Sequence, residues 1–503
     1  MTLGVLAIDQ GTTNTKALLI DASGSIVAQA SVPVTVSHPK PGWAEQSGDA
    51  VWRSVQAAIG ECITIRPDVA VTAIGISNQR ESVLIWDRET GDALGPCVTW
   101  QCRRSTERLA PLHAPEIKET VVQKTGLGLD PLFPAAKIAW LLDNIPGARA
   151  AAKAGKLCAG TVDTWLLARL TGGKQHATDV SNASRTQLFN IHQLKWDDDL
   201  ARLFDVPIGI LPEVLPSDGA FGLTVGHGPI PSGIPIRAMM GDSHAALYGH
   251  GVRAPGAVKA TYGTGSSLMM LIEGPIPSQN GLSTTIAWGT GGEVLYALEG
   301  NISVSGQAAA FATSLLGLAD ETALAQLAQT VTSSEGLYFI PALAGLGAPH
   351  WLPDVRGLFT GMSLSTRPAH FARATLDAIA LQIHDVFVAM QADRGTALSA
   401  LSADGGASRN DLLMQIQADV LQKPVRRSRV AELSAIGVGI MAGVGAAIWS
   451  EEEALSRLIK EADVFAPSVE ERDRTKHIAG WRAAIAQAIA GARQNLGTSN
   501  GGD

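Results

Sequence analysis

Two polar turns in this sequence carry residue types that can bind phosphate. The first, Asp9-Gln10-Gly11-Thr12-Thr13, follows the apolar run 4–8 and precedes a second apolar run, 17–20. Such a hairpin tip offers backbone N–H groups and hydroxyls that can surround phosphate oxygens, and a carboxylate that can hold the metal ion of a nucleotide. The sequence contains no G-x-x-x-x-G-K-[ST] motif, so binding would not use a P-loop. A Gly-Thr turn is also a common structural hairpin, and the pentapeptide alone leaves both interpretations open.

The second turn repeats this pattern in the other half of the chain. The strand-like segment 256–261 leads into Tyr262-Gly263-Thr264-Gly265-Ser266-Ser267, and the apolar run 268–272 follows. Two such hairpins predict two related α/β halves that hold phosphates from both sides, because ligands favour the interface between domains. The glycine-rich turn 402–408 precedes a helix expected over 410–421. It suits close approach of a ligand to backbone N–H groups, but taken alone the turn favours an ordinary strand-to-helix connection.

The segments around these turns alternate between strand and helix patterns. Strands are expected over 4–9, 15–21, 25–32 and 71–77, and amphipathic helices over 49–63 and 372–390. This alternation predicts an α/β fold with mixed sheets. The apolar run 435–449 is too short to span a bilayer, and its glycines favour a closely packed buried helix. A last helix is expected over 477–494, followed by a loose tail.

The composition is typical of a globular protein with more than one domain. The chain has 503 residues, of which 46% are hydrophobic and 17% charged. Its net charge of −8 argues against nucleic acid or an anionic membrane surface as the main partner. No signal peptide is apparent at the N-terminus. The cysteines lack C-x-x-C spacing and are expected to be free thiols in a reducing cytoplasm; they are Cys62, Cys97, Cys102 and Cys158.

Longer motifs resemble the FGGY family of carbohydrate kinases. Two family patterns match, one at Phe133-Pro134-Ala135-Ala136-Lys137-Ile138-Ala139-Trp140-Leu141 and one from Gly357-Leu358-Phe359-Thr360-Gly361-Met362 to Asp377. Shorter blocks resemble the glycerol kinases within this family, at residues 39–43, 78–81, 100–104, 160–165, 182–186 and 345–351. Together the blocks cover nearly the whole chain in the family's order.

The resemblance implies two actin-like ATPase domains of ribonuclease H topology, with a deep cleft between them. Residues 1–250 would form the N-terminal domain, with the acceptor site and the first phosphate hairpin. Residues 251–495 would form the C-terminal domain, with the second hairpin and the adenosine site, and residues 496–503 a flexible tail. The family also suggests a homodimer.

The resemblance further implies ATP and Mg²⁺ as cofactors and assigns their ligands. Asp9 would position Mg²⁺ through a water molecule. The residues expected around the ATP phosphates are Thr12, Thr13, Lys16, Gly263 and Thr264, and those expected around adenosine are Gly306, Gly405, Gly406, Ala407 and Asn410. The adenine-contacting glutamine of the family falls at Ala310, which suggests weaker selectivity for the base.

The acceptor alcohol would be held by residues at four matching positions, Arg80, Glu81, Trp100 and Asp242. Asp242 would be the general base that accepts the alcohol proton as the P–O bond forms, and Arg80 would donate to a substrate hydroxyl. Three family residues of this pocket are replaced by smaller ones: a tyrosine by Leu132, a glutamine by Ser243 and an aromatic residue by Ser267. These replacements predict a pocket with more room than glycerol requires.

The expected reaction is ATP-dependent phosphorylation of a small polyol, first of all glycerol to glycerol 3-phosphate. A tetritol, a pentitol or a ketose such as erythrulose or ribulose is the alternative, and His244 would either donate to an extra hydroxyl of such a substrate or pack in the core. A non-catalytic nucleotide-binding protein of the actin or Hsp70 kind, or a silent regulator, would share the hairpins. Such a protein would need no acceptor base, so Asp242 with Arg80 and Glu81 favours the kinase.

Overall fold

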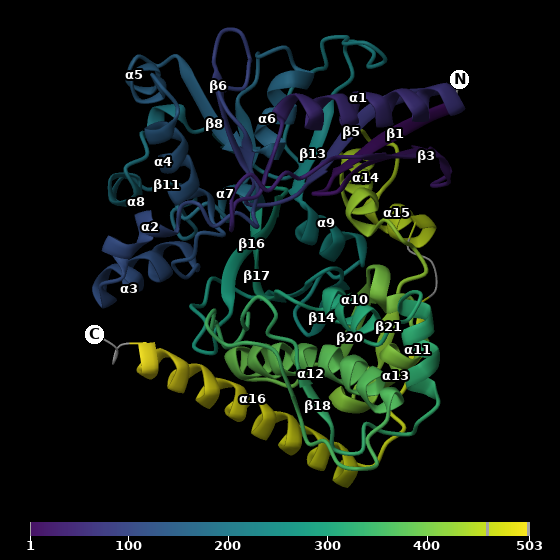
Figure 1. Cartoon of the computed structure of the whole chain (residues 1–503). Helices are drawn as coiled ribbons and strands as arrows, with labels where there is room; N and C mark the ends of the chain where they lie inside the picture. Colours follow the sequence, from purple (N-terminus) through teal and green to yellow (C-terminus); the bar gives the residue numbers. More distant parts are fainter. Residues whose placement is uncertain (1, 459–461, 500–503) are drawn as a thin grey trace.

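The first lobe is built around a five-stranded sheet of order β13-β5-β1-β2-β3 (Figure 1). A computed structural model describes residues 2–458 and 462–499 of the chain. Strands β1, β2 and β3 pair antiparallel with their neighbours. On the other side of β1, strand β5 pairs parallel to β1, and β13 pairs parallel to β5. The bounds are β1 Thr2–Gln10, β2 Asn14–Asp21, β3 Ile26–Pro33, β5 Val69–Asn78 and β13 Ile236–Gly241.

Both faces of this sheet are covered by helices. Alternate residues of a strand point to opposite faces, and Leu6 and Ile8 of β1 pack with helix α1 (Gly48–Ile65). Val5 and Ala7 pack on the other side with helix α14 (Leu433–Gly445). Because both faces are buried, β1 reads as a continuous apolar run rather than an alternating one.

The second lobe repeats the same strand order in a seven-stranded sheet, β16-β17-β15-β14-β20-β21-β22. Its members β17, β15 and β14 are antiparallel, and β20 and β21 continue in parallel from β14, as β5 and β13 do from β1. The predicted α/β fold with two related halves is therefore confirmed. The bounds are β14 Ala257–Tyr262, β15 Ser266–Ile272, β16 Ser283–Thr290, β17 Glu293–Ile302, β20 Ala400–Asp404, β21 Val425–Arg427 and β22 Asp463–Phe465.

Helices of the second lobe pack on one face of its sheet, where α12 and α13 contribute the largest share of the core. The predicted helices 372–390 and 410–421 correspond to α12 and α13. The bounds are α10 Gly306–Leu315, α11 Glu321–Gln329, α12 Pro368–Arg394 and α13 Asp411–Leu421, with β18 Tyr338–Ile340, β19 Leu358–Thr360 and the 3₁₀ turn η3 Gly406–Arg409.

A smaller four-stranded sheet, of order β4-β7-β6-β8, extends the first lobe together with short helices. Figure 1 shows α2 to α5 and α8 gathered on this side. The strands of this sheet are β4 Glu45–Gln46, β6 Val83–Asp87, β7 Cys97–Val98 and β8 Leu157–Thr161. Two separate two-stranded sheets pair β10 Phe189–Asn190 with β11 Lys195–Trp196, and β9 Ala177–Asp179 with β12 Glu213–Leu215. The helices are α2 Thr106–Leu109, α3 Pro115–Thr125, α4 Pro134–Asn144, α5 Ala148–Lys153, α6 Val162–Leu170, α7 Val180–Ala183, α8 Asp198–Phe204 and α9 Asp242–Gly249.

Helix α14 corresponds to the buried helix predicted over residues 435–449, but it begins at Leu433 and ends at Gly445. It returns from the second half of the sequence to the first lobe (Figure 1). Glycines allow its close approach: a Cβ on Gly437 would lie 1.9 Å from the Ala245 carbonyl oxygen of α9. A Cβ on Gly75 of β5 would likewise lie 2.4 Å from the Val438 carbonyl oxygen. The predicted domain boundary near residue 250 stays a prediction, and α14 with α15 (Glu451–Leu458) packs beyond it, on the first lobe.

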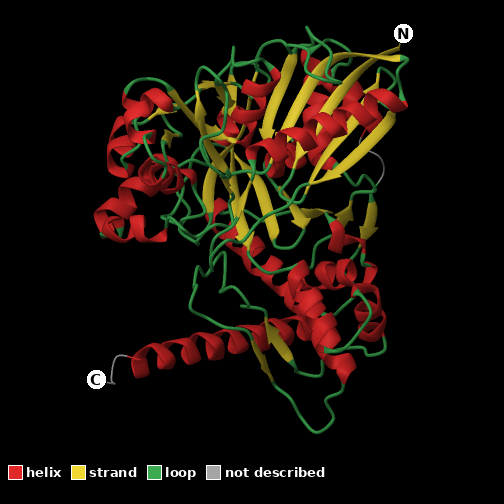
Figure 2. Cartoon of the chain, turned by 45° about the horizontal axis from the view of Figure 1, so that its top comes forward, coloured by secondary structure: helices red, strands yellow, loops and turns green. Residues whose placement is uncertain are grey.

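The last helix, α16 (Glu471–Ser499), is longer at both ends than the helix predicted over 477–494. It packs against the second lobe through Trp481, whose indole N–H donates to Asp385 at 2.7 Å, and Figures 1 and 2 show it extending away from that lobe. Residues 496–499 of the predicted tail are helical, and 500–503 lie outside the described residues.

The four cysteines are buried and free, as predicted. Within the described part of the chain, no helix combines the length and the apolarity that a membrane span requires.

Candidate active site

Three parallel strands of the first lobe end side by side, and polar residues follow at that edge. Asp9 of β1 pairs with Ser77 of β5, and Gly241 at the end of β13 pairs with Asn78. Helix α9 begins directly after β13 with Asp242. Ligands of open α/β sheets bind outside the carboxyl ends of the strands, so this edge is the expected site.

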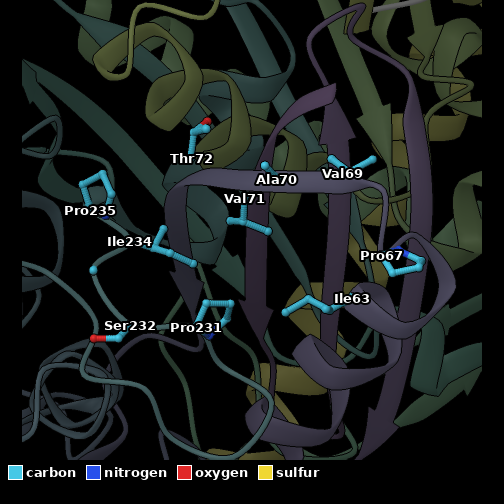
Figure 3. Close-up of a pocket in the computed structure, with 11 residues that line it drawn as sticks. Ile63, Pro67, Val69, Ala70, Val71, Thr72, Pro231, Ser232, Ile234 and Pro235 are labelled. Carbon is cyan, nitrogen blue, oxygen red and sulfur yellow. The ribbon is translucent and has the colours of Figure 1, made fainter. Parts of the chain in front are cut away.

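A surface groove of about 520 Å³ lies at the opposite end of β5 (Figure 3). Its lining comes from the end of α1, the start of β5 and the loop before β13, and includes Ile63, Val69, Thr72, Pro231 and Ile234. None of the predicted site residues lies in it, and the amino ends of the strands face it. The groove is therefore separate from the candidate active site.

The second lobe contributes the second hairpin and the turn predicted to bind adenosine in the same way. Parallel strands β14 and β20 pair Thr261 with Asp404, so Gly263 and Gly405 follow at one edge. A Cβ on Gly405, whose φ is +91°, would lie 2.5 Å from the Tyr262 carbonyl oxygen, and one on Gly306 would lie 2.6 Å from that of Gly263. Both positions therefore require glycine, and the predicted residues Gly263, Thr264, Gly306 and Gly405 come together.

The remaining residues of the predicted adenosine site lie just beyond Gly405. Gly406 and Ala407 form the start of the 3₁₀ turn η3. Asn410 caps helix α13, because its side-chain oxygen accepts from the Leu413 N–H at 3.1 Å. A role of Asn410 toward adenosine would come in addition to this capping role.

Lys16 of the first hairpin has a partner that the sequence did not reveal. Its Nζ donates to Glu432 Oε2 at 2.6 Å, and Glu432 precedes α14. Thr13 at the hairpin tip is exposed and Thr12 is half-buried. Lys16 therefore already has a carboxylate partner where the prediction placed phosphate, and nothing in the residue types around Glu432 signals this pairing.

The carboxylates of Asp9 and Asp242 lie close enough to affect each other. Burial and then the Asp242 charge raise the pKa of Asp9 to about 6, against a hydrogen bond from Ser77 at 2.9 Å. Partial burial also raises the pKa of Asp242, and the Arg80 charge opposes this shift. A divalent cation beside Asp9 would relieve this repulsion.

Arg80 is the centre of a cluster formed with Asp242, Ser243 and Glu299, here called the acceptor cluster after its predicted role, and is only 7% exposed. Its Nε donates to Asp242 Oδ1 at 3.1 Å, and its Nη2 donates to Ser243 Oγ at 3.2 Å. Its Nη1 lies 2.7 Å from Glu299 Oε1. Burial works against the Arg80 charge, but the carboxylates of Glu299, Glu81 and Asp242 outweigh it and raise the pKa of Arg80.

Glu299, fully buried in β17, connects this cluster to the second lobe. Its Oε2 lies 2.8 Å from Arg185 Nη1, and Arg185 Nε donates to Glu81 Oε1 at 2.7 Å. Ser267 donates its hydroxyl to Glu299 Oε1 at 3.0 Å. Although burial favours protonation, the charges of Arg185 and Arg80 hold the pKa of Glu299 below its usual range.

The prediction missed Glu299 and gave Arg185 no role. Arg185 lies in one of the matched blocks, 182–186, which could have marked it. Glu299 is a single carboxylate after the strand-like run 294–298, and an unpaired charge in a buried strand requires a partner. That signal predicts an ion pair but does not identify its partners.

Trp100 connects the predicted acceptor residues to the first hairpin. Its indole N–H donates to Thr12 Oγ1 at 2.9 Å, and its backbone N–H donates to Ser82 Oγ at 3.1 Å. Ser82 and Thr12 also donate to Gln79 Oε1, at 2.8 and 3.4 Å. The structure thus brings Trp100 together with the phosphate turn.

Two further predicted residues lie beside this cluster. The Leu132 carbonyl accepts a hydrogen bond from Lys137, which also binds Glu81. His244 is fully buried, its Nε2 lies 3.3 Å from Thr285 Oγ1, and burial lowers its pKa well below the usual value. These observations favour the packing role for His244.

Known proteins with this architecture were found by sequence and by structure. Models of the FGGY family of carbohydrate kinases match residues 4–249 with the N-terminal domain and residues 258–446 with the C-terminal domain. Apulose kinase of Pectobacterium atrosepticum is 47% identical over 96% of this chain and 98% of its own. A glycerol kinase of Burkholderia multivorans is 43% identical over 97% and 98%. The crystal structure of Plasmodium falciparum glycerol kinase with ADP has a TM-score of 0.92 and 31% identity, covering 97% of this chain and 98% of that one.

Proposed function

We propose that this chain, which belongs to the FGGY family of carbohydrate kinases, transfers the terminal phosphoryl group of ATP to a ketose or polyol larger than glycerol. The observation that carries the acceptor size is the pair Ser243 and Ser267, which bond to the two members of the Arg80–Glu299 ion pair. Both are smaller than the glutamine and aromatic residue expected at these positions in a glycerol kinase.

The relatives support the same acceptor class. The similarity to the apulose kinase, at 47%, exceeds that to the glycerol kinase of Burkholderia multivorans, at 43%, over nearly the same length. The suffix of apulose denotes a ketose. A carbonyl or an extra hydroxyl of such an acceptor would find donors and acceptors in the two serine hydroxyls.

The nucleotide would lie between the lobes. Thr12 and Thr13 would bind its phosphates from the first hairpin, and Gly263 and Thr264 would bind them from the second. Lys16 would add a charge if it exchanges Glu432 for phosphate. The predicted adenosine residues, Gly306, Gly405, Gly406, Ala407 and Asn410, would line the rest of the site.

Asp9 fits a Mg²⁺ ion bound with ATP. Mg²⁺ usually keeps several waters and takes only one or two protein carboxylates besides substrate phosphates. Accordingly, the described residues contain no group of three or more His, Cys, Asp or Glu placed to hold a metal. When bound, Mg²⁺ neutralises charge on the phosphates.

Asp242 would act as the general base. Its side chain remains 38% exposed, so an acceptor can reach it, and Arg80 Nε holds its Oδ1 in place. Asp242 would accept the proton of the attacking hydroxyl, while Arg80, Glu81, Trp100 and Leu132 would orient the acceptor beside it. Closure of the lobes would exclude water and favour transfer to the acceptor over hydrolysis.

An ADP-release assay with glycerol, erythritol, erythrulose, ribulose and apulose tests this proposal. We expect at least one larger acceptor to exceed glycerol by about tenfold or more in kcat/KM. Asp242→Asn should abolish turnover while ATP affinity stays near that of the wild type. If no acceptor raises ADP release above the ATP-only background, the kinase proposal is wrong.

Glycerol is the second candidate acceptor. The presence of Arg80, Glu81, Trp100 and Asp242 in one cluster favours it, because these are the residues expected in a glycerol kinase. A higher kcat/KM for glycerol than for every larger acceptor would establish this alternative and overturn the proposed acceptor class.

A further inference from the structure

Lys137 of α4 is a completely buried lysine whose ammonium group is held by two backbone carbonyls. Its Nζ donates to the Glu81 carbonyl oxygen at 3.0 Å and to the Leu132 carbonyl oxygen at 2.6 Å. Glu81 and Leu132 belong to two different segments of the predicted acceptor pocket. The Lys137 side chain therefore links these two segments from the protein interior.

Burial of the Lys137 ammonium charge is unfavourable, and the pKa of this group reflects the loss of hydration. Burial lowers the pKa of Lys137 to about 8, although the nearby Glu81 charge opposes the shift. The surrounding residues of α4 are apolar and pack in a core with Ile85, Val98 and Leu157. An apolar side chain would suit this core better, so the distinctive contribution of the lysine is its hydrogen bonds.

The first carbonyl belongs to a residue in an unusual conformation. Glu81 has φ of +59°, in the left-handed region that non-glycine residues rarely adopt. Its side chain accepts a hydrogen bond from Arg185, and the preceding Arg80 reaches Asp242. The Lys137 hydrogen bond compensates the buried Glu81 carbonyl and so stabilises the backbone that directs both side chains.

The second carbonyl belongs to the turn that leads into α4. The Leu132 N–H donates to Asp130 Oδ1 at 2.8 Å, and the Leu132 carbonyl accepts from Lys137. Phe133, the next residue, lies against the Arg185 guanidinium at 5.2 Å. Hydrogen bonds to Asp130 and Lys137 and the contact of Phe133 with Arg185 therefore hold this turn beside the acceptor cluster.

We propose that Lys137 is a positioning residue for the acceptor: it sets the spacing between Glu81 and Leu132 and, through Glu81, the direction of Arg80. This inference rests on the proposed kinase function. Lys137 bonds to backbone behind the pocket and is fully buried, so it acts through these residues and does not touch the acceptor.

Substitution of Lys137 tests the proposal, because it should raise the KM for the acceptor but not the KM for ATP. Lys137→Met keeps the apolar stem and removes the donors. We expect the KM for the best acceptor to rise by roughly tenfold to a hundredfold, the size expected for lost charge-assisted hydrogen bonds, while the KM for ATP stays within about twofold. Lys137→Gln keeps a shorter donor and should give a smaller rise in the acceptor KM.

Ile138→Val is the matched control. Ile138 is buried on the same helix, in the same core, and has no polar atom to lose. This variant should lower the thermal midpoint slightly and leave both KM values unchanged. A general loosening of α4 would instead move the acceptor KM in all three variants.

The outcomes separate this inference from the proposed function. A wild-type protein without turnover on any acceptor overturns the proposed function. An active wild type whose Lys137→Met and Lys137→Gln variants keep the acceptor KM within about twofold overturns the positioning role. Equal rises in the ATP and acceptor KM, or loss of folding in both variants, would assign Lys137 to stability and also overturn it.

Discussion

The indole N–H of Trp100 donates a hydrogen bond to the hydroxyl of Thr12 at 2.9 Å. Trp100 is a predicted acceptor residue, and Thr12 is a predicted phosphate ligand. The Thr12 carbonyl accepts a second bond from Gln46 Nε2 at 2.7 Å, which fixes the turn further. The two predicted substrate sites therefore share a direct polar contact, so a change in one of them should affect the other.

We expect Trp100→Phe and Thr12→Val to be non-additive. Each variant removes one partner of the same hydrogen bond, so the double variant should lose less kcat/KM than the two single losses together. The coupling energy should be about 0.5–1.5 kcal/mol, the net value of one hydrogen bond. Steady-state kinetics on the four proteins of the cycle measures it.

Trp140→Phe provides the control for shortening a tryptophan. Trp140 packs edge-on against Trp43 at a centroid distance of 5.2 Å, away from Thr12. Its combination with Thr12→Val should be additive. A Trp100–Thr12 cycle that is also additive would show that the contact does not couple the two sites.

Glu299→Gln should destabilise the fold as well as impair catalysis. The substitution leaves Arg80 and Arg185 buried with one carboxylate fewer, and breaking a buried ion pair costs about 3–5 kcal/mol. Urea unfolding should show a lower midpoint with an unchanged slope.

Glu451→Gln is the exposed counterpart of this change. Glu451 pairs with Arg253 at 2.8 Å but its side chain remains 44% exposed, so its loss should cost less than about 1 kcal/mol. Equal midpoints for the Glu299 and Glu451 variants would contradict a dominant role for the buried network.

Local sequence patterns predicted most of the fold because they depend on neighbouring residues. The run before Asp9 is apolar on both faces, the run before Tyr262 is apolar apart from Lys259 and Thr261, and Gly-Thr turns end both, so strand and turn positions followed directly. The same patterns could not predict that α14 returns to the first lobe. Its glycines indicated close packing, but not the helix against which it packs.

The candidate site was predicted where its residues follow strand ends, and missed where it depends on distant partners. Asp9 lies at the end of β1, and Arg80 and Asp242 follow β5 and β13, which marks all three as residues of the sheet edge. The partners of Lys16 and Arg80 are 416 and 219 residues away in the sequence, and no local pattern encodes such a pairing.

Mg²⁺-ATP binding should weaken as the pH falls through 6. The folded-state pKa of Asp9 is about 6, against an ordinary value of 3.8, so Asp9 takes up a proton below pH 6. A carboxylate that positions Mg²⁺ through a water molecule attracts the ion only when it is deprotonated, so binding near pH 6 should release protons. Calorimetry in two buffers of different ionisation enthalpy measures this release, and Asp9→Asn should abolish it.

The same shift predicts a pH-dependent effect on stability. Between pH 3.8 and 6 the folded state binds more protons at Asp9 than the unfolded state, so the Asp9 contribution to stability falls as the pH rises through this window. Without nucleotide, Asp9→Asn should be more stable than the wild type at pH 7. A lower stability of Asp9→Asn at pH 7 would contradict the raised pKa.

Gly437→Ala should separate α9 from α14 and displace the proposed base. The new Cβ would lie 1.9 Å from the Ala245 carbonyl oxygen, so the two helices must move apart. Asp242 begins α9, and its carbonyl accepts from Ser434 of α14 at 3.0 Å, so the movement reaches the site. We expect a loss of about 1–3 kcal/mol of stability from overpacking, and a fall in kcat of up to about 100-fold, because small displacements of reacting groups are costly.

Gly445→Ala separates this effect from the helix preference of alanine. Gly445 is the last residue of α14, and a Cβ there would meet Arg237 Cβ at 3.5 Å, an ordinary contact. Alanine favours a helix over glycine by up to about 1 kcal/mol, so this variant should be as stable as the wild type or more so, with unchanged kcat. Thermal unfolding measures the stability of both variants, and steady-state kinetics measures their kcat. If Gly437→Ala behaves like Gly445→Ala, the close crossing of α9 and α14 does not hold Asp242 in place.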